Sequence, residues 1–199
     1  MPTYFDTVSK SFADVPVTDA GVDTAAFLEA SEGVVKLFDL FGSAAFSVVQ
    51  NDMRGNIEKI KARYNSDKTA NATLESLVVN ESKEKKRTAT EGLLWLLRGL
   101  KFTCTALQRS EKDQSEELSV SFTKAYEVTL RQYHSFVVRP VFSLAMKACP
   151  YRKVFYEKLG GDAPAAKVQS ELQNWLTGLE TVVNRLDKFY EEGKHAKGL

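Results

Sequence analysis

Three polar residues follow one edge of a predicted helix. Asp52, Asn56 and Lys59 are separated by four and three positions, which places their side chains along one side of a helix that turns by about 100° per residue. The apolar face of that helix is formed by Ala45, Phe46, Val49, Met53, Ile57, Ile60 and Tyr64. The three polar side chains therefore border the buried face, where a carboxylate, an amide and an ammonium group can hydrogen-bond a polar ligand. The alternative is an ordinary helix border, with Lys59 extending to solvent and Asp52 paired with Arg63 or with a neighbouring helix.

Trp95 and His134 extend this set of candidate binding groups. In the segment "TEGLLWLLRGLKFTCTALQ", a leucine stripe packs one side of a helix and Trp95 lies on the opposite side with Phe102 and Ala106. Trp95 therefore either packs in a second layer or faces a cavity. His134 is the only histidine outside the C-terminal tail, and it falls within an apolar face if residues 119–148 are helical. Its ring nitrogens must find partners, either within the core or on a ligand.

The residue types and spacings give little support to an enzyme. The sequence contains no nucleophile spaced to a base, no glycine-rich phosphate loop and no cluster of metal ligands. We therefore expect no catalytic residues, no metal and no cofactor. A helical hydrolase that uses His134 and Asp52 is the enzymatic alternative.

Helical periodicity dominates the chain, so the elements that position these residues are predicted to be helices. The predicted helices cover residues 3–14, 23–42, 43–64, 73–87, 90–108, 119–148, 151–159 and 164–192. Pro140 lies inside the sixth of them, where its ring predicts a kink or a break. The pattern predicts an all-α protein with a single domain, residues 1–199.

Composition limits the partners and the location. Lys and Arg number 27 against 26 Asp and Glu, a net charge of +1, which leaves no global field to hold nucleic acid. Cys104 and Cys149 lie in apolar contexts without a metal or redox spacing, which suits a reducing compartment. The sequence has neither a secretory signal pattern nor an apolar run of about 20 residues. We expect a cytoplasmic protein that does not cross a membrane.

Three segments, in this order, carry a resemblance to a known family. They are "FGSAAFSVVQNDMRGNIEKIKARY" with Asp-x-x-x-Asn-x-x-Lys, "LLWLLRGLKF" with Trp-Leu-x-Arg-Gly-Leu, and "TKAYEVTLRQYHSFVV" with Tyr-His. With these separations, the chain resembles the glycolipid transfer protein family over nearly its whole length, and it is most similar to the fungal heterokaryon-incompatibility members. The resemblance implies a two-layer bundle of about eight helices with a lipid pocket between the layers.

The resemblance also implies a role for each candidate residue. Trp95 would stack on the first sugar ring of a glycosphingolipid, and Asp52, Asn56 and Lys59 would hydrogen-bond its hydroxyls. Asp52 would also accept from the ceramide amide N–H, and His134 would donate to the ceramide carbonyl. The apolar pocket for the ceramide chains would comprise Phe46, Val49, Phe102, Leu130, Phe142, Ala145 and Phe155. The membrane contact would comprise Phe136, Arg139, Tyr151, Arg152 and Lys153.

The implied function is a carrier that moves a glycosphingolipid between membranes without chemical change. It would act as a monomer that touches membranes transiently and peripherally. Relatives that carry ceramide-1-phosphate have cationic residues at the positions of Asn56 and Trp95, so this chain favours a neutral sugar. Arg98 and Lys59 are nearby cations, so a sulfated sugar is a further alternative for the headgroup. The alternatives are a glycolipid sensor that signals through a protein partner and a ceramide-1-phosphate carrier.

The sequence departs from the family pattern at one residue and in one segment. Phe136 stands where animal members have a tryptophan that docks at the membrane, and a phenylalanine lacks the indole N–H that suits the interface. The C-terminal "EEGKHAKGL" also differs from the animal tail. No site residue is carried over from that tail.

Overall fold

The computed structural model describes residues 2–199, and within them helices account for nearly all regular structure. The α-helices are α1 Thr24–Leu37, α2 Ser47–Ser66, α3 Leu74–Glu81, α4 Thr88–Lys112, α5 Leu118–Val128, α6 Val138–Lys147, α7 Arg152–Gly160 and α8 Ala165–Glu192. The short elements are the 3-10 helices η1 Phe12–Asp14, η2 Phe38–Phe41, η3 Ala44–Phe46 and η4 Arg131–Tyr133, with the antiparallel strands β1 Val17–Thr18 and β2 Gly21–Val22. The all-α prediction is confirmed, although the small hairpin was not predicted.

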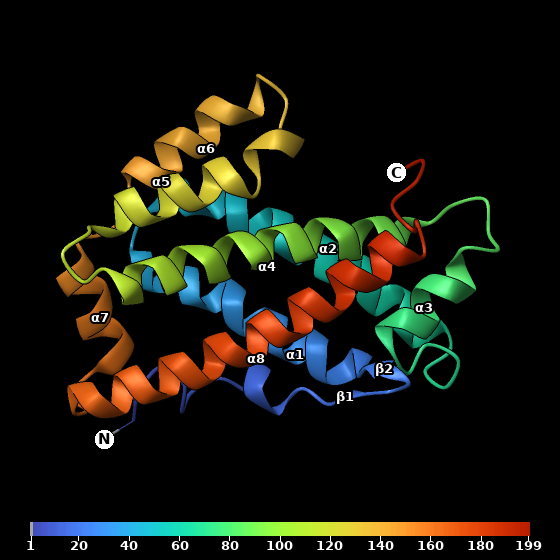
Figure 1. Ribbon diagram of the computed structural model, residues 1–199, viewed down its shortest axis with the longest axis horizontal. Coiled ribbons are helices and arrows are strands. Elements are labelled where there is room, and N and C mark those ends of the chain that lie inside the picture. Colours follow the sequence, from blue (N-terminus) through green and yellow to red (C-terminus); the bar gives the residue numbers. More distant parts are fainter. Residues whose placement is uncertain (1) are drawn as a thin grey trace.

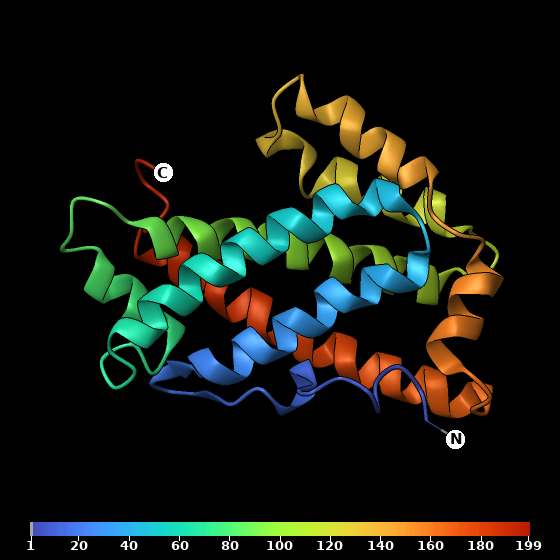
Figure 2. The same cartoon turned by 180° about the vertical axis from the view of Figure 1, so that it is seen from behind.

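The helices form two layers. Figure 1 shows α4 and α8 in front of α1 and α2, and Figure 2 shows the same layers from behind, with α1 and α2 in front. Helices α5 and α6 lie along one side of this pair of layers, α7 closes one end and α3 lies at the other. The predicted two-layer architecture is therefore confirmed.

Helix α4 lies at the centre of the bundle and contacts α2, α5 and α8. Its leucine stripe is buried, and Phe102 and Ala106 on the opposite side are buried as well. This explains why the helix is apolar almost all round, since it is covered on more than one side. None of the described helices is long and apolar enough to span a membrane.

Local signals set the limits of α1 as predicted. The Asp23 carboxylate accepts a hydrogen bond from the Ala26 N–H at 2.8 Å, which caps the helix at its start. The 3-10 turn η2 continues α1 and ends at Gly42, whose φ of 66° lies in the left-handed region. These two residues define the second predicted helix almost to the residue.

The predicted helix over residues 3–14 is wrong. This segment forms turns and only the short η1. Its backbone bonds to distant parts of the chain, because the Tyr4 N–H donates to the Leu159 carbonyl at 2.8 Å. A Cβ on Gly178 of α8 would lie only 2.4 Å from the Ala13 nitrogen, so α8 packs directly against this backbone. Such long-range contacts outweigh a local helical preference.

The predicted helix over residues 119–148 is two helices. α5 ends at Val128, and nine residues that include η4 separate it from α6. Pro140 is the third residue of α6, where its missing N–H falls among first-turn donors that lack a partner within the helix. The helix therefore breaks well before Pro140, and the proline lies in the first turn of α6, where it does not kink the helix.

Candidate functional site

Two glycines set the approach of α2 and α4. A Cβ on Gly92 would lie 3.1 Å from the Lys59 side chain and 3.3 Å from the Asn56 carbonyl, and a Cβ on Gly99 would lie 3.9 Å from Met53. The two helices therefore run antiparallel in close contact. Trp95 lies between the two glycines, so it stands at the level of Met53 to Asn56 on the facing helix.

The three polar residues of α2 form a connected row. The Asn56 amide nitrogen donates to the Asp52 carboxylate at 3.4 Å, and the Lys59 ammonium donates to the Asn56 amide oxygen at 3.3 Å. Both distances are at the long end of the hydrogen-bond range, which leaves these groups free to bind something better placed. Asn56 is only 4% exposed, whereas Asp52 and Lys59 reach solvent. The row thus runs along the border between core and surface, as predicted.

The Asp52 carboxyl group has a perturbed pKa. Although the residue as a whole is exposed, loss of solvent around its carboxyl raises the pKa, and the positive charge of Lys59 opposes this rise. A carboxylate that is partly stripped of water gains from a ligand that donates hydrogen bonds to it.

Trp95 is half-buried and held by its neighbours. The Arg98 guanidinium lies 4.6 Å from the Trp95 ring centre and 3.7 Å from that of Tyr133, so one cation contacts both rings. The His134 ring lies 6.1 Å from Trp95 with only 17° between the ring planes. Trp95 and His134, 39 positions apart in the sequence, are thus brought together as nearly parallel rings.

His134 lies in the loop between η4 and α6, with an extended backbone, and not on a helix as predicted. The Tyr126 hydroxyl lies 3.1 Å from its Nδ1, and the Phe142 ring lies 4.4 Å from the imidazole. Burial lowers the pKa of His134, and the positive charges of Arg139 and Arg98 lower it further. The imidazole is therefore neutral near pH 7, with one nitrogen able to donate and one able to accept.

The residues predicted to form the apolar pocket are all buried. The aromatic members are connected by further rings in what we call the aromatic row, with neighbouring ring centres 5.2–6.4 Å apart. From the His134 end, the aromatic row consists of Phe142, Tyr126, Phe102, Phe122, Phe41 and Phe155. Phe46 contacts this row through Phe41 at 4.6 Å. These side chains pack on one another and fill the interior between His134 and α7.

Three residues of the aromatic row were missed from the sequence: Tyr126, Phe122 and Phe41. Phe41 and Phe122 look like ordinary core residues, and nothing in their spacing separates them from the rest of the core. Tyr126 carried one usable signal, because a buried histidine needs a hydrogen-bond partner and a tyrosine eight residues away was available.

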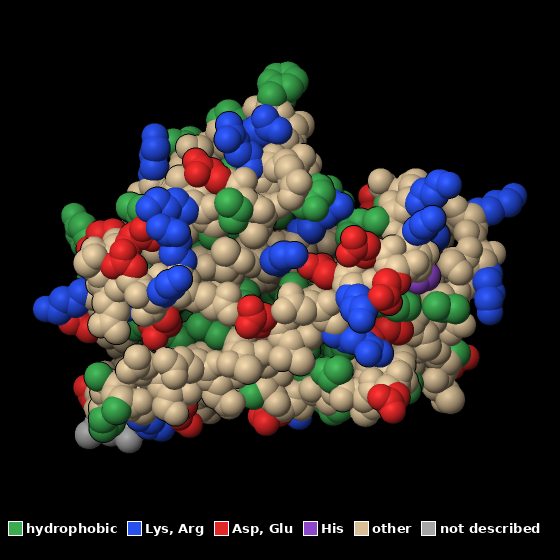
Figure 3. Space-filling view, viewed as in Figure 1, with side chains coloured by type: hydrophobic (Ala, Val, Ile, Leu, Met, Phe, Trp, Pro, Cys, Tyr) green, Lys and Arg blue, Asp and Glu red, His purple; other side chains and the backbone are tan. Residues whose placement is uncertain are grey.

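Four of the five predicted membrane contacts are exposed: Phe136, Arg139, Tyr151 and Lys153. Phe136 is the extreme case, at 83% exposed, and hydrophobic side chains with Lys and Arg beside them form the tip above α6 in Figure 3. The Arg152 side chain points into the protein and not outward as a membrane contact would. Its guanidinium donates to the Ser110 carbonyl at 2.6 Å and pairs with Glu111 at 3.5 Å. Its side chain is consequently only 15% exposed.

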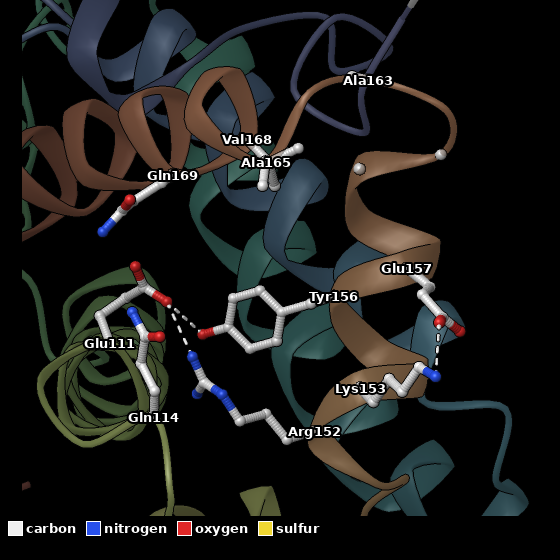
Figure 4. Close-up of a pocket in the computed structure, with 12 residues that line it drawn as sticks. Glu111, Gln114, Arg152, Lys153, Tyr156, Glu157, Ala163, Ala165, Val168 and Gln169 are labelled. Atoms are coloured by element: carbon white, nitrogen blue, oxygen red, sulfur yellow. Dashed lines mark hydrogen bonds and ion pairs between the residues drawn. The ribbon is translucent and has the colours of Figure 1, made fainter.

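Arg152 instead belongs to a cavity of about 420 Å³ between the end of α4, α7 and the start of α8. Figure 4 shows Arg152 and Tyr156 both reaching Glu111, with the Tyr156 hydroxyl donating at 2.6 Å. Lys153 turns the other way and lies 3.8 Å from Glu157. These contacts fasten α7 to α4 and leave no free charge on Arg152 for a membrane.

Residues 22–161 match the family model described as glycolipid transfer protein. The chain belongs to the glycolipid transfer protein family. It is 50% identical over 187 residues to a glycolipid transfer protein of Aureobasidium melanogenum, an alignment that covers 94% of this chain and 92% of that protein. It is also 37% identical to the pleckstrin homology domain-containing family A member 8 of Mus musculus, covering 96% of this chain but 39% of that longer protein.

Solved structures agree with this membership. The chain superposes on the crystal structure of HET-C2, a fungal glycolipid transfer protein, with a TM-score of 0.92 and 49% identity, covering 98% of this chain and 100% of the other. It superposes on FAPP2, whose glycolipid transfer fold is described as selecting simple glycosphingolipids, with a TM-score of 0.88 and 35% identity over 98% of this chain and 97% of the other. The mouse ceramide-1-phosphate transfer protein shares the fold at 23% identity, with a TM-score of 0.86 and 98% of each chain covered. The predicted family and its fungal affinity are confirmed.

Proposed function

We propose that this protein binds one glycosphingolipid and transfers it between membranes without changing it chemically. The observation that carries the proposal is that Trp95 lies between two glycines of α4 that pack against the polar row's helix α2, while its ring lies beside His134 at one end of the aromatic row. A polar mouth on an apolar interior is the usual arrangement of a small-ligand site. The names of the fungal relatives at about half identity support the same substrate class.

The sugar ring would lie against Trp95. A sugar has an apolar C–H face and a rim of hydroxyls, so a flat aromatic ring beside a carboxylate, an amide and an ammonium group suits both parts. Asp52 would accept hydrogen bonds, Lys59 would donate them, and Asn56 can do either. A phosphate in this position would have only Lys59 in the polar row as a cation, which favours a neutral headgroup.

The ceramide amide would lie between Asp52 and His134. Asp52 would accept from the amide N–H. If His134 Nδ1 accepts from the Tyr126 hydroxyl, the proton of the neutral imidazole resides on Nε2, which can then donate to the amide carbonyl. Tyr126 would thus select the tautomer that the ligand requires.

The hydrocarbon chains would occupy the interior now filled by the aromatic row. Phe46, Val49, Phe102, Leu130, Phe142, Ala145 and Phe155 would surround them. These side chains must part to admit a lipid, and each methylene that moves from bilayer to protein instead of water avoids a cost of about 0.8 kcal/mol. An apolar interior therefore makes extraction from a bilayer feasible.

The membrane contact would comprise Phe136, Arg139, Tyr151 and Lys153, without Arg152. The protein would act as a monomer that is peripheral at membranes and leaves them again. The near-neutral net charge supports this cycle, because a strongly basic protein would stay on anionic membranes.

A vesicle assay tests the proposal. Donor vesicles carry fluorescent galactosylceramide, lactosylceramide or ceramide-1-phosphate, and acceptor vesicles carry none. We expect many lipids to be moved per protein molecule for the two glycolipids and little transfer of ceramide-1-phosphate. Release of free sugar or fatty acid would instead support the hydrolase, and tight binding without repeated transfer would support the sensor.

A further inference from the structure

A second cavity lies between α5 and α6, at the tip that carries Phe136. Its volume is about 360 Å³, and its lining comes from α5, η4, α6 and the loop between η4 and α6. The lining residues are Thr123, Tyr126, Glu127, Arg131, Phe136, Arg139, Pro140, Ser143 and Met146. None of the polar groups proposed to hold the sugar lines this cavity.

Two arginines line this cavity without an anionic partner. Neither Arg131 nor Arg139 forms an ion pair with any residue that the structure describes, although Glu127 lines the same cavity. The Arg139 Nε donates to the carbonyls of His134 at 3.0 Å and Arg131 at 3.3 Å, which fixes the guanidinium in place. Its two Nη groups have no hydrogen-bond partner within residues 2–199, so they remain available to a ligand.

The rest of the lining is largely apolar. Met146 is buried, Pro140 and Phe136 form further apolar walls, and Phe136 extends into solvent. Guanidinium groups bind phosphate oxygens through paired N–H donors. Phosphate-binding cations beside an apolar, membrane-facing residue fit a molecule that carries both a phosphate and hydrocarbon.

We propose that this cavity binds the headgroup phosphate of an anionic phospholipid while the protein is docked on a membrane. Arg131 and Arg139 would grip the phosphate oxygens, and Phe136 would enter the hydrocarbon beside it. The proposal rests on the membrane contact proposed above, but it requires neither the sugar site nor transfer.

Occupation of the cavity would reach the glycolipid site through His134. Arg139 bonds the His134 carbonyl, and Tyr126, which lines the cavity, lies 3.1 Å from His134 Nδ1. Both contacts hold the imidazole that is proposed to bind the ceramide amide. A phospholipid phosphate that binds Arg139 would therefore shift the His134 imidazole, which is proposed to donate to the ceramide carbonyl.

Vesicle binding tests the proposal through a ratio. The affinity for vesicles of phosphatidylcholine with phosphatidylglycerol is divided by the affinity for phosphatidylcholine alone. We expect Arg131→Gln to lower this ratio tenfold or more, because it removes a charge-assisted hydrogen bond to the phosphate in addition to one surface charge. Lys147→Gln is the matched control, because Lys147 is an exposed cation of α6 outside the cavity. A drop in the ratio as large for Lys147→Gln as for Arg131→Gln would mean diffuse attraction and would overturn the proposal.

A second variant separates a cavity from a charged surface. Ser143→Leu partly fills the cavity and leaves every charge in place. We expect it to lower the ratio while binding to neutral vesicles and glycolipid transfer from them persist, which keeps this test independent of the proposed function. An unchanged ratio would refute the cavity. Titration with inorganic phosphate alone should leave the His134 ring resonances unmoved at millimolar concentration, and a saturating shift there would assign the cavity to a soluble anion instead.

Discussion

At the scale of single residues, Trp95 is oriented by three neighbours. Arg98 approaches its ring, Tyr133 meets it edge-on with ring centres 6.4 Å apart, and His134 lies nearly parallel to it. These contacts limit rotation of the indole and present it in a fixed direction. A ligand that stacks on Trp95 therefore pays little ordering entropy, which is the general benefit of preorganisation.

Replacement of Trp95 tests the sugar site directly. We expect Trp95→Ala to lower glycolipid transfer tenfold or more, because loss of an aromatic contact costs about 2 kcal/mol and 1.4 kcal/mol is a factor of ten. The far-ultraviolet circular dichroism should be unchanged, since the core stripe of α4 lies on its leucine side. Trp175→Phe is the control: Trp175 packs in the core against Phe5 and Phe12, so its loss should affect stability and spare transfer. Wild-type transfer by Trp95→Ala would defeat the site.

Asp52 is expected to act at both the sugar and the amide. Asp52→Val removes an acceptor from each, so we expect glycolipid uptake from vesicles to fall by at least tenfold, the loss of one charge-assisted hydrogen bond of about 1.5–3 kcal/mol. Thermal stability should change little, since the only side-chain hydrogen bond that Asp52 makes within the described chain is the long one from Asn56. Uptake at the wild-type rate would contradict the assigned role.

His134 should make stability depend on pH. Its pKa in the folded protein lies below the ordinary 6.5, so below about pH 6.5 the unfolded chain binds more protons and the free energy of unfolding falls. His195 shifts in the same direction through burial and the nearby Arg87. We expect His134→Gln to lessen the loss of stability between about pH 7.5 and pH 5.5, as measured by urea unfolding. An equal loss in wild type and variant would show that His134 titrates normally.

At the scale of elements, the contact of α2 with α4 depends on Gly92. An alanine there gains about 1 kcal/mol of helix propensity, but its Cβ would crowd Lys59 and Asn56, at a cost of about 1–3 kcal/mol. We expect Gly92→Ala to leave stability unchanged or lower, and to slow transfer because Asn56 and Lys59 shift against Trp95.

Gly55 provides the matched control on the facing helix. It lies within α2, and nothing lies within 4 Å of the Cβ it would carry as alanine. Gly55→Ala should therefore raise the free energy of unfolding by about 0.8–1 kcal/mol and leave transfer unchanged. Thermal unfolding and vesicle transfer on both variants check the pair. Faster transfer by Gly92→Ala would contradict the packing argument.

At the scale of the whole molecule, the proposed membrane contact includes Phe136, which lies in the loop between η4 and α6. Phe136 and Val137, in the loop before α6, and Leu144, within α6, are all largely exposed. Apolar side chains that gather on a surface mark a contact with a membrane or a partner. His134 and Phe142, at one end of the aromatic row, lie in the same segment as this surface, so docking would bring the proposed site toward the bilayer.

Loss of Phe136 should weaken docking without harming the fold. Burial of a phenylalanine in hydrocarbon is worth about 1.5–3 kcal/mol, so Phe136→Ala should lower partitioning onto neutral vesicles tenfold or more. Val79→Ala, which removes an exposed apolar side chain from α3 at the other end, should leave partitioning unchanged. Vesicle flotation measures the partitioning of both variants. An equal fall in partitioning for Phe136→Ala and Val79→Ala would show that the membrane contact does not include Phe136.

Features that depend on local sequence were predictable. The apolar period, the Asp23 cap and Gly42 were enough to predict the limits of α1. The spacing of Asp52, Asn56 and Lys59 was enough to predict that they form a row at the edge of the core. The family resemblance then connected that row with Trp95 and His134, which no local pattern could do. The seven apolar residues followed from the same resemblance, and all of them are buried.

Only the tertiary structure decided where several backbone and side-chain groups find their partners. Residues 3–14 are not helical, because their backbone contacts α7 and α8. His134, in a loop, has Tyr126 of α5 as its hydrogen-bond partner, and the Arg152 side chain points inward to Glu111. The physical reason is common to all three. Helix propensity and capping act between residues a few positions apart, so the sequence by itself determines them. A buried polar group takes whichever partner the packed chain brings within reach, and that choice exists only once the layers have assembled.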